Sequence, residues 1–460
     1  MRRFSVTGYS LLLIALLALA VVLRFWGLGE KPLHTDEAVQ AYKLGQLLSG
    51  SGYTYDPIDH HGPILYYLEA VVCRIAGQNS FAELTAAVLR IIPALFGVLL
   101  VFAVFLWRRC GVDKSVLIAA TCLGATSPMA VYYARYFIQE TILVACFWAA
   151  VPLWWRLCFG NKDTTANKWA LAMLSGVLFG LAVSAKETWV LMIGAVILAL
   201  AIIWGVGFVR HSRRRDSSIR ESSESSAALP MTFSRCSVLW LAVSLGVAIV
   251  VAAAFYSSFG KNPQGVVDAA SAYAGYFQKT SGGPHDKWVG WYGVNFFGTF
   301  KLGKSNYIME GITICACLIT LCALSVRKIW KPEERRIAAF SLLSGGILFL
   351  IYSFISYKTP WLLLGVLPPL WLAAGYGVIL MWRFLLKHLP LLGIPCAVTA
   401  VFLLVYNCWQ LTRRLAVDER NPLAYVHTSG DILRVEPWVK RLESVSPDKA
   451  GFHVNVIASE

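Results

Sequence analysis

The sequence has few charged residues and no pattern of paired cysteines. Only 15% of its 460 residues are Asp, Glu, Lys or Arg, whereas a soluble domain carries roughly 25%. The eleven cysteines lie in or beside apolar segments, and none forms a CxxC pair. An ordinary soluble domain is therefore excluded, and a disulfide framework is not expected.

Long apolar blocks occupy the chain instead. Apolar residues make up 57% of it, and the mean hydropathy is +0.60. The blocks run for about 18 to 23 residues, which is the length of helix that crosses about 30 Å of hydrocarbon. The sequence therefore predicts an all-α polytopic membrane protein with about eleven transmembrane helices. These are expected near residues 11–23, 90–107, 115–132, 138–155, 168–185, 188–209, 236–257, 307–326, 337–356, 361–382 and 390–409.

The first apolar run resembles a secretory signal only in part. It follows Arg2 and Arg3, but Arg24-Phe25-Trp26 comes after it where a cleavage site would have small residues. An uncleaved first span is therefore expected. Lys and Arg recur in the loops that lie on the same side as the N-terminus, which predicts a cytoplasmic N-terminus in the cell (inner) membrane.

This orientation places three large segments outside the cytoplasm. They are residues 24–89, 258–306 and 411–460. Residues 1–410 are expected to form the transmembrane domain, and 411–460 either a short extracytoplasmic segment or a truncated soluble domain. The loop at 258–306 is rich in aromatic residues and is expected to cover a site as a lid or to lie on the membrane interface.

The net charge of +15 falls largely on the cytoplasmic loops, where anionic lipid attracts it. Nucleic acid is excluded as a partner, because the basic residues are spread over many loops and do not gather on one module.

Ionisable residues beside the apolar spans are expected on one face. Such groups are costly near hydrocarbon and usually functional. Counting spans places four sets on the outer face, and Lys186 is expected close to Asp36 or Glu37. The sets are His34, Asp36, Glu37, His60 and His61 in the first outer loop, Arg135 and Glu140 between spans three and four, Lys186 and Glu187 between spans five and six, and Lys358 between spans nine and ten.

Each set except Lys186 and Glu187 has a simpler structural explanation. That pair lies directly between two apolar segments, with almost no loop to carry it into water. The alternatives are a helix N-cap for Asp36 and Glu37 before a helix expected at 38–48, a turn before Pro63 for His60 and His61, a solvated pair for Arg135 and Glu140, and a snorkelling side chain for Lys358.

Together these acidic and basic residues could act on a lipid-linked substrate whose phosphate lies at the depth of the lipid headgroups. A carboxylate at the surface can take a proton from a hydroxyl, and Arg or Lys near the lipid can hold a phosphate. A divalent cation is a further option for the His and Asp residues of the first loop, although no ligand spacing demands it, and the metal stays unknown.

Several stretches resemble a known superfamily. RFWGLGEKPLHTDEA at 24–38 and HHGPILYYL at 60–68 resemble the first outer loop of GT-C membrane glycosyltransferases. These include the dolichyl-phosphate-mannose protein mannosyltransferases and the lipid A aminoarabinose transferase. Further stretches resemble the flippase activity-associated family of archaea and bacteria: ARYFIQET at 134–141, SAKETW at 184–189, SYKTPWL at 356–362 and NPLAYVHTS at 421–429.

The resemblance implies a GT-C bundle with a large first extracytoplasmic loop. It implies inverting transfer of a sugar, of hexosyl or mannosyl type, from a polyprenyl-phosphate-linked donor to a glycan, lipid or protein acceptor. It implies Asp36 as the catalytic base with Glu37 beside it. Arg135, Lys186 and Lys358 become candidates to stabilise the leaving phosphate, and His34, His60, His61, Glu140 and Glu187 candidates to contact substrate.

The rival function is a transporter, or a non-catalytic partner, of a lipid-linked sugar flippase. Transporters tend to show repeat symmetry and polar residues at the membrane midplane. This sequence shows no repeat, and its charged residues lie at the outer ends of spans. An enzyme is therefore favoured.

Overall fold

A computed structural model gives the fold of the chain, and every structural statement below concerns the residues it describes. These are residues 6–50, 53–57, 61–160, 163–216, 235–278, 285–302 and 305–445.

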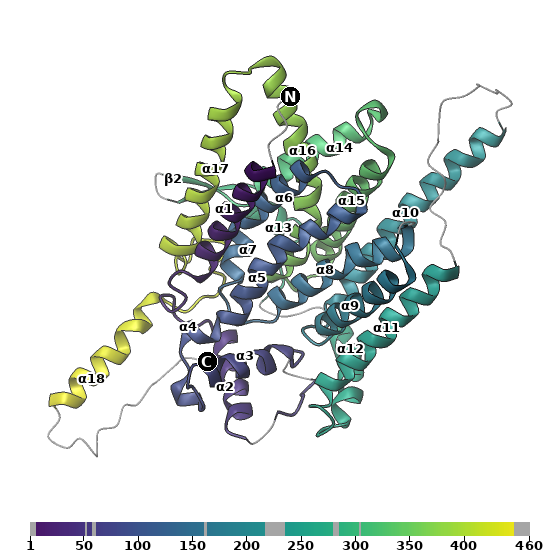
Figure 1. Cartoon of the computed structure of the whole chain (residues 1–460). Helices are drawn as coiled ribbons and strands as arrows, with labels where there is room; N and C mark the ends of the chain where they lie inside the picture. Colours follow the sequence, from purple (N-terminus) through teal and green to yellow (C-terminus); the bar gives the residue numbers. More distant parts are fainter. Residues whose placement is uncertain are drawn as a thin grey trace.

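Within these residues, nine helical segments are long and apolar enough to cross a bilayer (Figure 1). The aligned helices form one bundle, and the first and last of them lie near one another at one side (Figure 1). The segments are α1 (Val6–Phe25), Ala86–Cys110 made of α4 (Ala86–Leu89), α5 (Ile91–Ala103) and η2 (Val104–Cys110), α8 (Glu140–Phe159), α9 (Thr165–Val183), α10 (Trp189–Asp216), α11 (Arg235–Tyr256), α15 (Pro332–Phe354), α16 (Leu367–His388), and α17 (Gly393–Trp409) with η5 (Gln410–Arg414).

Two shorter apolar helices complete the eleven expected from the sequence. They are α6 (Lys114–Thr126) and α14 (Gly311–Leu324), each about 20 Å long at 1.5 Å per residue. The span expected at 115–132 is broken because Ser127 caps a new helix, α7 (Pro128–Tyr133), by accepting a hydrogen bond from the backbone of Ala130.

Glycines on α16 allow both short helices to pack closely against it. A Cβ on Gly375 would lie 2.6 Å from the carbonyl oxygen of Val116 in α6, and one on Gly377 would lie 2.0 Å from that of Ala316 in α14. Small residues at helix contacts let backbones approach, which is how helices pack where lipid removes the hydrophobic driving force.

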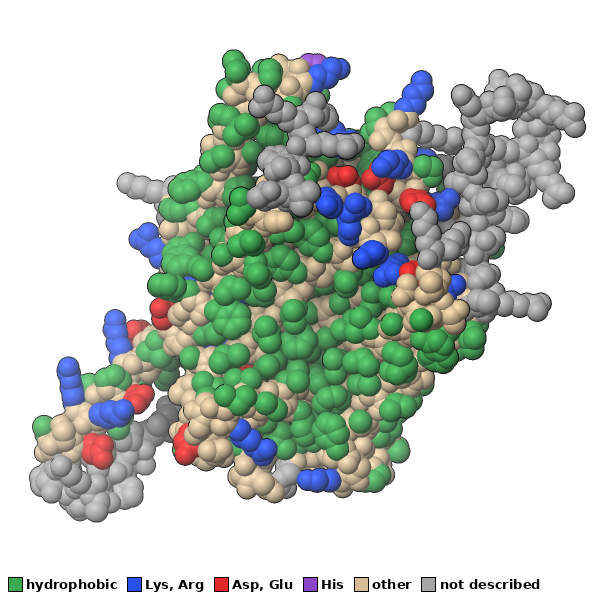
Figure 2. Space-filling model, viewed as in Figure 1, with side chains coloured by type: hydrophobic (Ala, Val, Ile, Leu, Met, Phe, Trp, Pro, Cys, Tyr) green, Lys and Arg blue, Asp and Glu red, His purple; other side chains and the backbone are tan. Residues whose placement is uncertain are grey.

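The surface carries a broad apolar belt. Figure 2 shows hydrophobic side chains covering the middle of the molecule, with Lys and Arg concentrated toward the end where α16 and α10 finish. Large apolar side chains are exposed on helices at the rim of the bundle, among them Leu11, Ile197, Val250 and Phe402. In water such a surface would be unfavourable, whereas lipid solvates it. The chain is an integral membrane protein.

The segment after α1, which the sequence predicts to be the first outer loop and which keeps that name below, folds into short helices at the opposite end of the bundle (Figure 1). They are α2 (Thr35–Leu48), α3 (Ile64–Ile75) and η1 (Phe81–Glu83), which lead into α4. The helix expected at 38–48 therefore begins earlier, at Thr35, because His34 caps it.

The segment at 258–306 contains α12 (Gln264–Gln278), α13 (Trp291–Phe296) and strand β1 (Thr299–Leu302). β1 pairs antiparallel with β2 (Ser305–Ile308), with Thr299 opposite Ile308, and this hairpin is a small departure from an all-helical fold. The remaining elements are η3 (Arg327–Ile329), η4 (Pro360–Gly365), η6 (Gly430–Arg434) and α18 (Val435–Val445), which extends away from the bundle (Figure 1).

Candidate functional site

Asp36 lies in the first turn of α2, where its carboxylate oxygen Oδ2 is 3.9 Å from Nδ1 of the capping residue His34. The cap is His34, whose Nδ1 accepts a hydrogen bond from the backbone of Asp36 at 3.0 Å. Glu37 completes the capping box by accepting from the backbone of His34 at 2.9 Å. Of the two acids offered as an alternative helix cap, Glu37 takes part in the cap, whereas Asp36 does not accept a hydrogen bond there. Its side chain is 45% exposed, so it can meet a ligand.

Glu37 has a different environment from its neighbour. It is fully buried and paired with Arg90, with Oε1 2.7 Å from Nε and Oε2 2.8 Å from Nη2. Its Oε1 also accepts from the backbone of Phe137 at 2.8 Å. Burial alone would raise the pKa of Glu37, but Arg90 lowers it to about 2. Both oxygens are thus engaged in holding three segments together.

Arg135 closes the end of α1. Its guanidinium donates to the carbonyl oxygens of Arg24, Trp26 and Gly27 at 3.1, 2.7 and 2.8 Å. A cation is favourable at this helix end, because the last carbonyls of a helix lack partners within it. Burial nevertheless lowers the pKa of Arg135 to about 9. Its donors face protein carbonyls, so the structure gives it an anchoring position.

Lys186 and Glu140 form a buried ion pair between the α9–α10 turn and the start of α8. Burial disfavours the charge on Lys186, but Glu140 holds its pKa above the usual value. The pKa of the Tyr357 phenol depends on burial and on the charges of Lys186, Asp36 and Glu140. Burial raises its pKa first, Lys186 lowers it, and the charges of Asp36 and Glu140 raise it further. The charges of Asp36 and of the Lys186–Glu140 pair thus both act on Tyr357.

Glu187 binds the first outer loop. Its Oε2 lies 3.1 Å from Nδ1 of His61, and its Oε1 accepts from the Tyr55 hydroxyl at 3.3 Å. Burial would raise the pKa of Glu187, but His61 lowers it. His60 and Asp59 lie outside the described residues, so the substrate role predicted for His60 stays a prediction.

The first outer loop also contacts the α9–α10 turn through its backbone. Gly62 donates to the carbonyl of Ala185 at 3.0 Å, and Ile64 donates to that of Ser184 at 3.2 Å. A Cβ on Gly62 would lie 2.0 Å from the Ser184 oxygen. Only glycine allows this approach without a shift of the backbone.

Lys358 anchors the segment between α15 and η4. Its Nζ donates to the carbonyls of Lys287, at 3.1 Å, and Ile355. Its backbone donates to that of His285, and Asp286 forms an antiparallel bridge with Tyr357. Part of the 258–306 loop therefore lies directly beside Tyr357.

Residues near the C-terminal end, to which the sequence assigned no role, complete the site. The His427 ring centroid lies 5.8 Å from that of His34 and 5.6 Å from that of Tyr136. Burial, followed by the charge of Lys31, lowers the pKa of His427 to about 4. NPLAYVHTS was visible as a motif, but nothing in the sequence indicated that it returns to α2.

The described residues contain no cluster of three or more His, Cys, Asp or Glu that could hold a metal ion. Asp59 and His60 fall outside that search. The divalent cation therefore stays a prediction.

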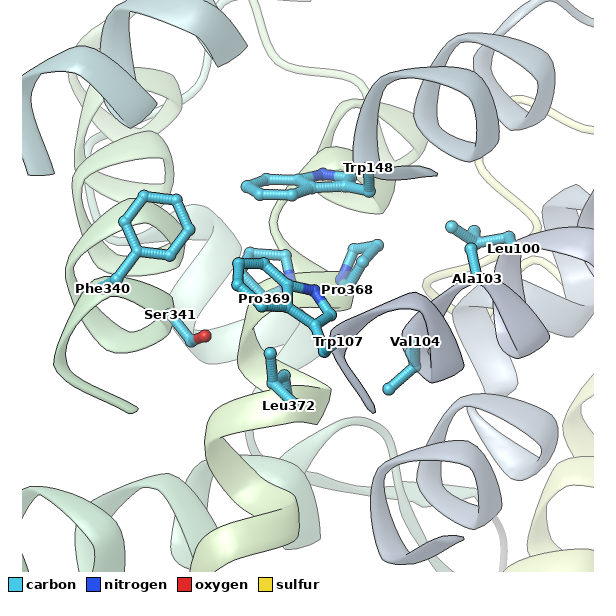
Figure 3. A pocket seen from close by; sticks show the side chains of 10 residues that line it. All are labelled: Leu100, Ala103, Val104, Trp107, Trp148, Phe340, Ser341, Pro368, Pro369 and Leu372. Carbon is cyan, nitrogen blue, oxygen red and sulfur yellow. The ribbon is translucent and has the colours of Figure 1, made fainter. Parts of the chain in front are cut away.

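A cavity of about 20 Å³ lies inside the helix bundle and not at this site (Figure 3). Figure 3 shows Trp148 across from Pro368 and Pro369, with Trp107 and Phe340 on the same cavity. This volume holds about one water, so it is too small for a sugar or a lipid chain.

Comparison with known proteins gives the family. The family described as dolichyl-phosphate-mannose-protein mannosyltransferase matches residues 14–261. The chain belongs to this family. The match includes α2, the Glu37–Arg90 pair and the α9–α10 turn, which are the elements that position Asp36.

One relative of this chain is dolichyl-phosphooligosaccharide-protein glycotransferase 3 of Archaeoglobus fulgidus. The two are 31% identical over an alignment 231 positions long, and this alignment covers 44% of this chain and 26% of the relative. The match thus spans about a quarter of the relative's length.

Solved structures show the same fold. The A. fulgidus oligosaccharyltransferase AglB, in complex with an inhibitory peptide and a dolichol-phosphate, matches with a TM-score of 0.52 at 14% identity over 96% of this chain and 58% of that one. ArnT from Cupriavidus metallidurans, bound to undecaprenyl phosphate, matches with a TM-score of 0.55 at 15% identity over 93% and 76%. The chain therefore has the GT-C fold. This confirms the all-α membrane fold of GT-C type that was expected from the sequence.

Proposed function

We propose that this protein is a membrane glycosyltransferase. It transfers a sugar from a polyprenyl-phosphate-linked donor to a glycan, lipid or protein acceptor on the extracytoplasmic face, with Asp36 as general base. The observation that carries the proposal is the contrast between two adjacent acids. Glu37 is buried and held by Arg90, whereas the Asp36 side chain is 45% exposed in the same helix turn.

The reaction balances as a single displacement. Asp36 takes the proton from the acceptor group, which forms a bond to the anomeric carbon of the sugar. The bond from that carbon to the phosphate oxygen breaks, and its electron pair leaves with the lipid phosphate. Such a displacement inverts the anomeric centre. General-base catalysis of this kind contributes typically about 10²–10⁴-fold.

The donor class is supported by family membership and by the ligands of the two solved structures, which are dolichol-phosphate and undecaprenyl phosphate. The hexosyl or mannosyl nature of the sugar is part of the proposal, as is a location in the cell (inner) membrane with the N-terminus in the cytoplasm.

The other residues of the site take positioning roles in this proposal. Arg135 and Lys358 bind backbone carbonyls, and Lys186 is paired with Glu140. They hold the walls of the site and do not supply the charge for the leaving phosphate. His61 and Glu187 tie the first loop to the α9–α10 turn.

The domain division extends the same proposal. Residues 1–410 form the transmembrane domain, and 411–460 are extracytoplasmic, with the segment around His427 forming a wall of the site. The part of the 258–306 loop beside Tyr357 acts as a lid that excludes water.

The direct test is transfer by purified protein in nanodiscs, with a polyprenyl-phosphate hexose labelled in the sugar and a panel of acceptors. Formation of labelled product by wild type, but not by Asp36→Asn, is expected. Movement of the labelled lipid across proteoliposomes without product would instead identify a transporter and overturn the proposal.

A further inference from the structure

The candidate site contains four cations whose partners are all supplied by the protein itself. Arg90 pairs with Glu37, and Lys186 with Glu140. Arg135 and Lys358 donate to backbone carbonyls. A phosphate would have to displace these partners, which would leave buried acids or carbonyls unpaired at a cost of about 1–3 kcal/mol each. The charge for a leaving phosphate should therefore come from elsewhere.

Lys31 differs from these four residues. Its side chain is 94% buried (6% exposed), and its Nζ has no hydrogen-bond partner among the described residues. The ammonium lies over the ring of Tyr136, 3.4 Å from its centroid, and 4.4 Å from that of Tyr132. Aromatic faces attract a cation, but they leave its three N–H donors unused.

The buried amine of Lys31 has charged residues of both signs in its surroundings. Burial lowers the pKa of Lys31 well below its usual range, and the nearby charge of Arg90 lowers it further. Glu37 opposes this effect, but its oxygens already bind Arg90. The lowered pKa favours the neutral amine when no anion is bound, whereas an anion bound beside Lys31 would stabilise its protonated form.

Lys31 is close to the proposed base. The Lys31 ammonium lies over the Tyr136 ring, whose centroid is 5.6 Å from that of His34, and Nδ1 of His34 is 3.9 Å from a carboxylate oxygen of Asp36. Asp36 is on the exposed side of this group, whereas Lys31 is on its buried side. A donor that enters past Asp36 would thus bring its most buried polar group toward Lys31.

A strained C-terminal segment forms the opposite wall. Val426 has a φ of +48°, which is rare for a β-branched residue and costs of order 1–3 kcal/mol. Contacts of neighbouring residues hold this segment. The Tyr133 hydroxyl donates to the carbonyl oxygen of Leu423 at 2.9 Å, and the Tyr425 hydroxyl oxygen lies 2.9 Å from Nδ1 of His285. His427 packs against the same Tyr136 ring that Lys31 lies over, with the ring centroids 5.6 Å apart, and its Nε2 has no hydrogen-bond partner in the described chain.

We propose that Lys31 binds the phosphate of the lipid-linked donor, beside the segment that carries His427. This inference rests on the proposed function and adds the cation that the reaction needs. As the sugar leaves, negative charge grows on the phosphate, and a fixed desolvated ammonium stabilises that charge more than a solvated one could.

The test is equilibrium binding of undecaprenyl phosphate and of undecaprenol to the full-length protein in phosphatidylcholine nanodiscs. Wild type should prefer the phosphate. Lys31→Met, which keeps the apolar stem and removes the charge, should weaken phosphate binding by about 10- to 100-fold and leave undecaprenol binding unchanged. Lys31→Arg should retain part of the preference. The matched control is Lys261→Met, an exposed lysine, which should bind as wild type does.

Thermal unfolding of the same samples separates binding from a structural role. If Lys31 serves only to pack on Tyr136, Lys31→Met loses stability and keeps its phosphate preference, which overturns the inference. Equal competition by inorganic phosphate or by phosphatidylglycerol would overturn the assignment to the donor. Transfer that fails in wild type while Lys31-dependent binding persists would overturn the proposed function alone.

Discussion

Glu37 and Arg90 meet in a fully buried two-pronged ion pair, although 53 residues separate them. The other donors of Arg90 bind the carbonyls of Leu28, Lys31 and Pro32 at 2.7 to 2.9 Å. One arginine therefore fixes both the segment that enters α2 and the first turn of α2. The neighbour of Glu37, Asp36, takes its position from this anchor.

Asp36→Asn should reduce transfer by about 10²–10⁴-fold while stability changes by less than about 1 kcal/mol. The reason is that the amide keeps the shape of the side chain but cannot accept the proton, and the helix cap belongs to His34. Turnover and thermal unfolding should be measured on one preparation.

Asp36→Ala serves as the control for this prediction. Because Asp36 does not cap α2, alanine should lose as much activity as asparagine and fold as well. Wild-type turnover in either variant would remove Asp36 from the mechanism.

Glu37→Gln should destabilise the protein by about 3–5 kcal/mol, because it leaves the Arg90 charge buried and unpaired. The measurement is the free energy of unfolding in detergent micelles. Any activity that remains should fall with the folded fraction.

A double-mutant cycle tests the cause of that loss. Glu37→Gln combined with Arg90→Met should be less destabilised than the sum of the two single variants, since neither charge is then left alone. Additive losses would show that the pair is not coupled in the way the geometry indicates.

Gly62→Ala should destabilise the fold by about 1–3 kcal/mol through overpacking against the Ser184 carbonyl. The matched control is Gly194→Ala in α10, where a Cβ meets nothing within 4 Å. That change should be neutral or slightly stabilising, because alanine favours helix. Equal unfolding temperatures for the two variants would contradict the close approach seen at Gly62.

His427 should make stability depend on pH between about 6.5 and 4. Its pKa is about 4 in the folded chain and 6.5 without the burial and the Lys31 charge. Below 6.5 the unfolded chain therefore binds the proton first, and the free energy of unfolding falls with decreasing pH, by at most about 1.4 kcal/mol per pH unit.

His427→Asn should reduce this slope in the same pH window. The neighbouring His34 also has a pKa lowered by burial, so part of the slope should remain. Identical pH profiles for wild type and His427→Asn would show that His427 is accessible to protons in the folded chain.

Reporter fusions should place Ser217 in the cytoplasm and Asp431 outside it. The prediction follows from the distribution of Lys and Arg over alternate loops. A fusion after Arg109 should report the same side as Ser217. If Ser217 and Asp431 report one side, the orientation of the site is wrong.

The membrane spans could be predicted from the sequence because the bilayer imposes length and hydrophobicity on each of them. Counting spans then placed Arg135, Lys186 and Lys358 at the same end. The break at Ser127 was missed, since a cap inside an apolar stretch depends on one side chain. Hydropathy averaged over a window does not detect it.

The roles of individual charges were harder to predict, because each depends on a partner distant in sequence. Lys186 is held by Glu140, and Arg135 by carbonyls at the end of α1. No local pattern encodes these pairings. Lys31 was overlooked because a lysine in a polar loop is usually solvated, and only the tertiary fold buries it.

The contact of Gly62 with the α9–α10 turn has a consequence for the order of assembly. The backbone donors of Gly62 and Ile64 bind carbonyls of Ala185 and Ser184, which a ribosome synthesises about 120 residues later. The segment around Gly62 is therefore made before its partner exists, and it remains without this contact until α9 and α10 have both been inserted. The arrangement of the candidate site becomes a late product of biogenesis, although Asp36 precedes most of the spans along the chain.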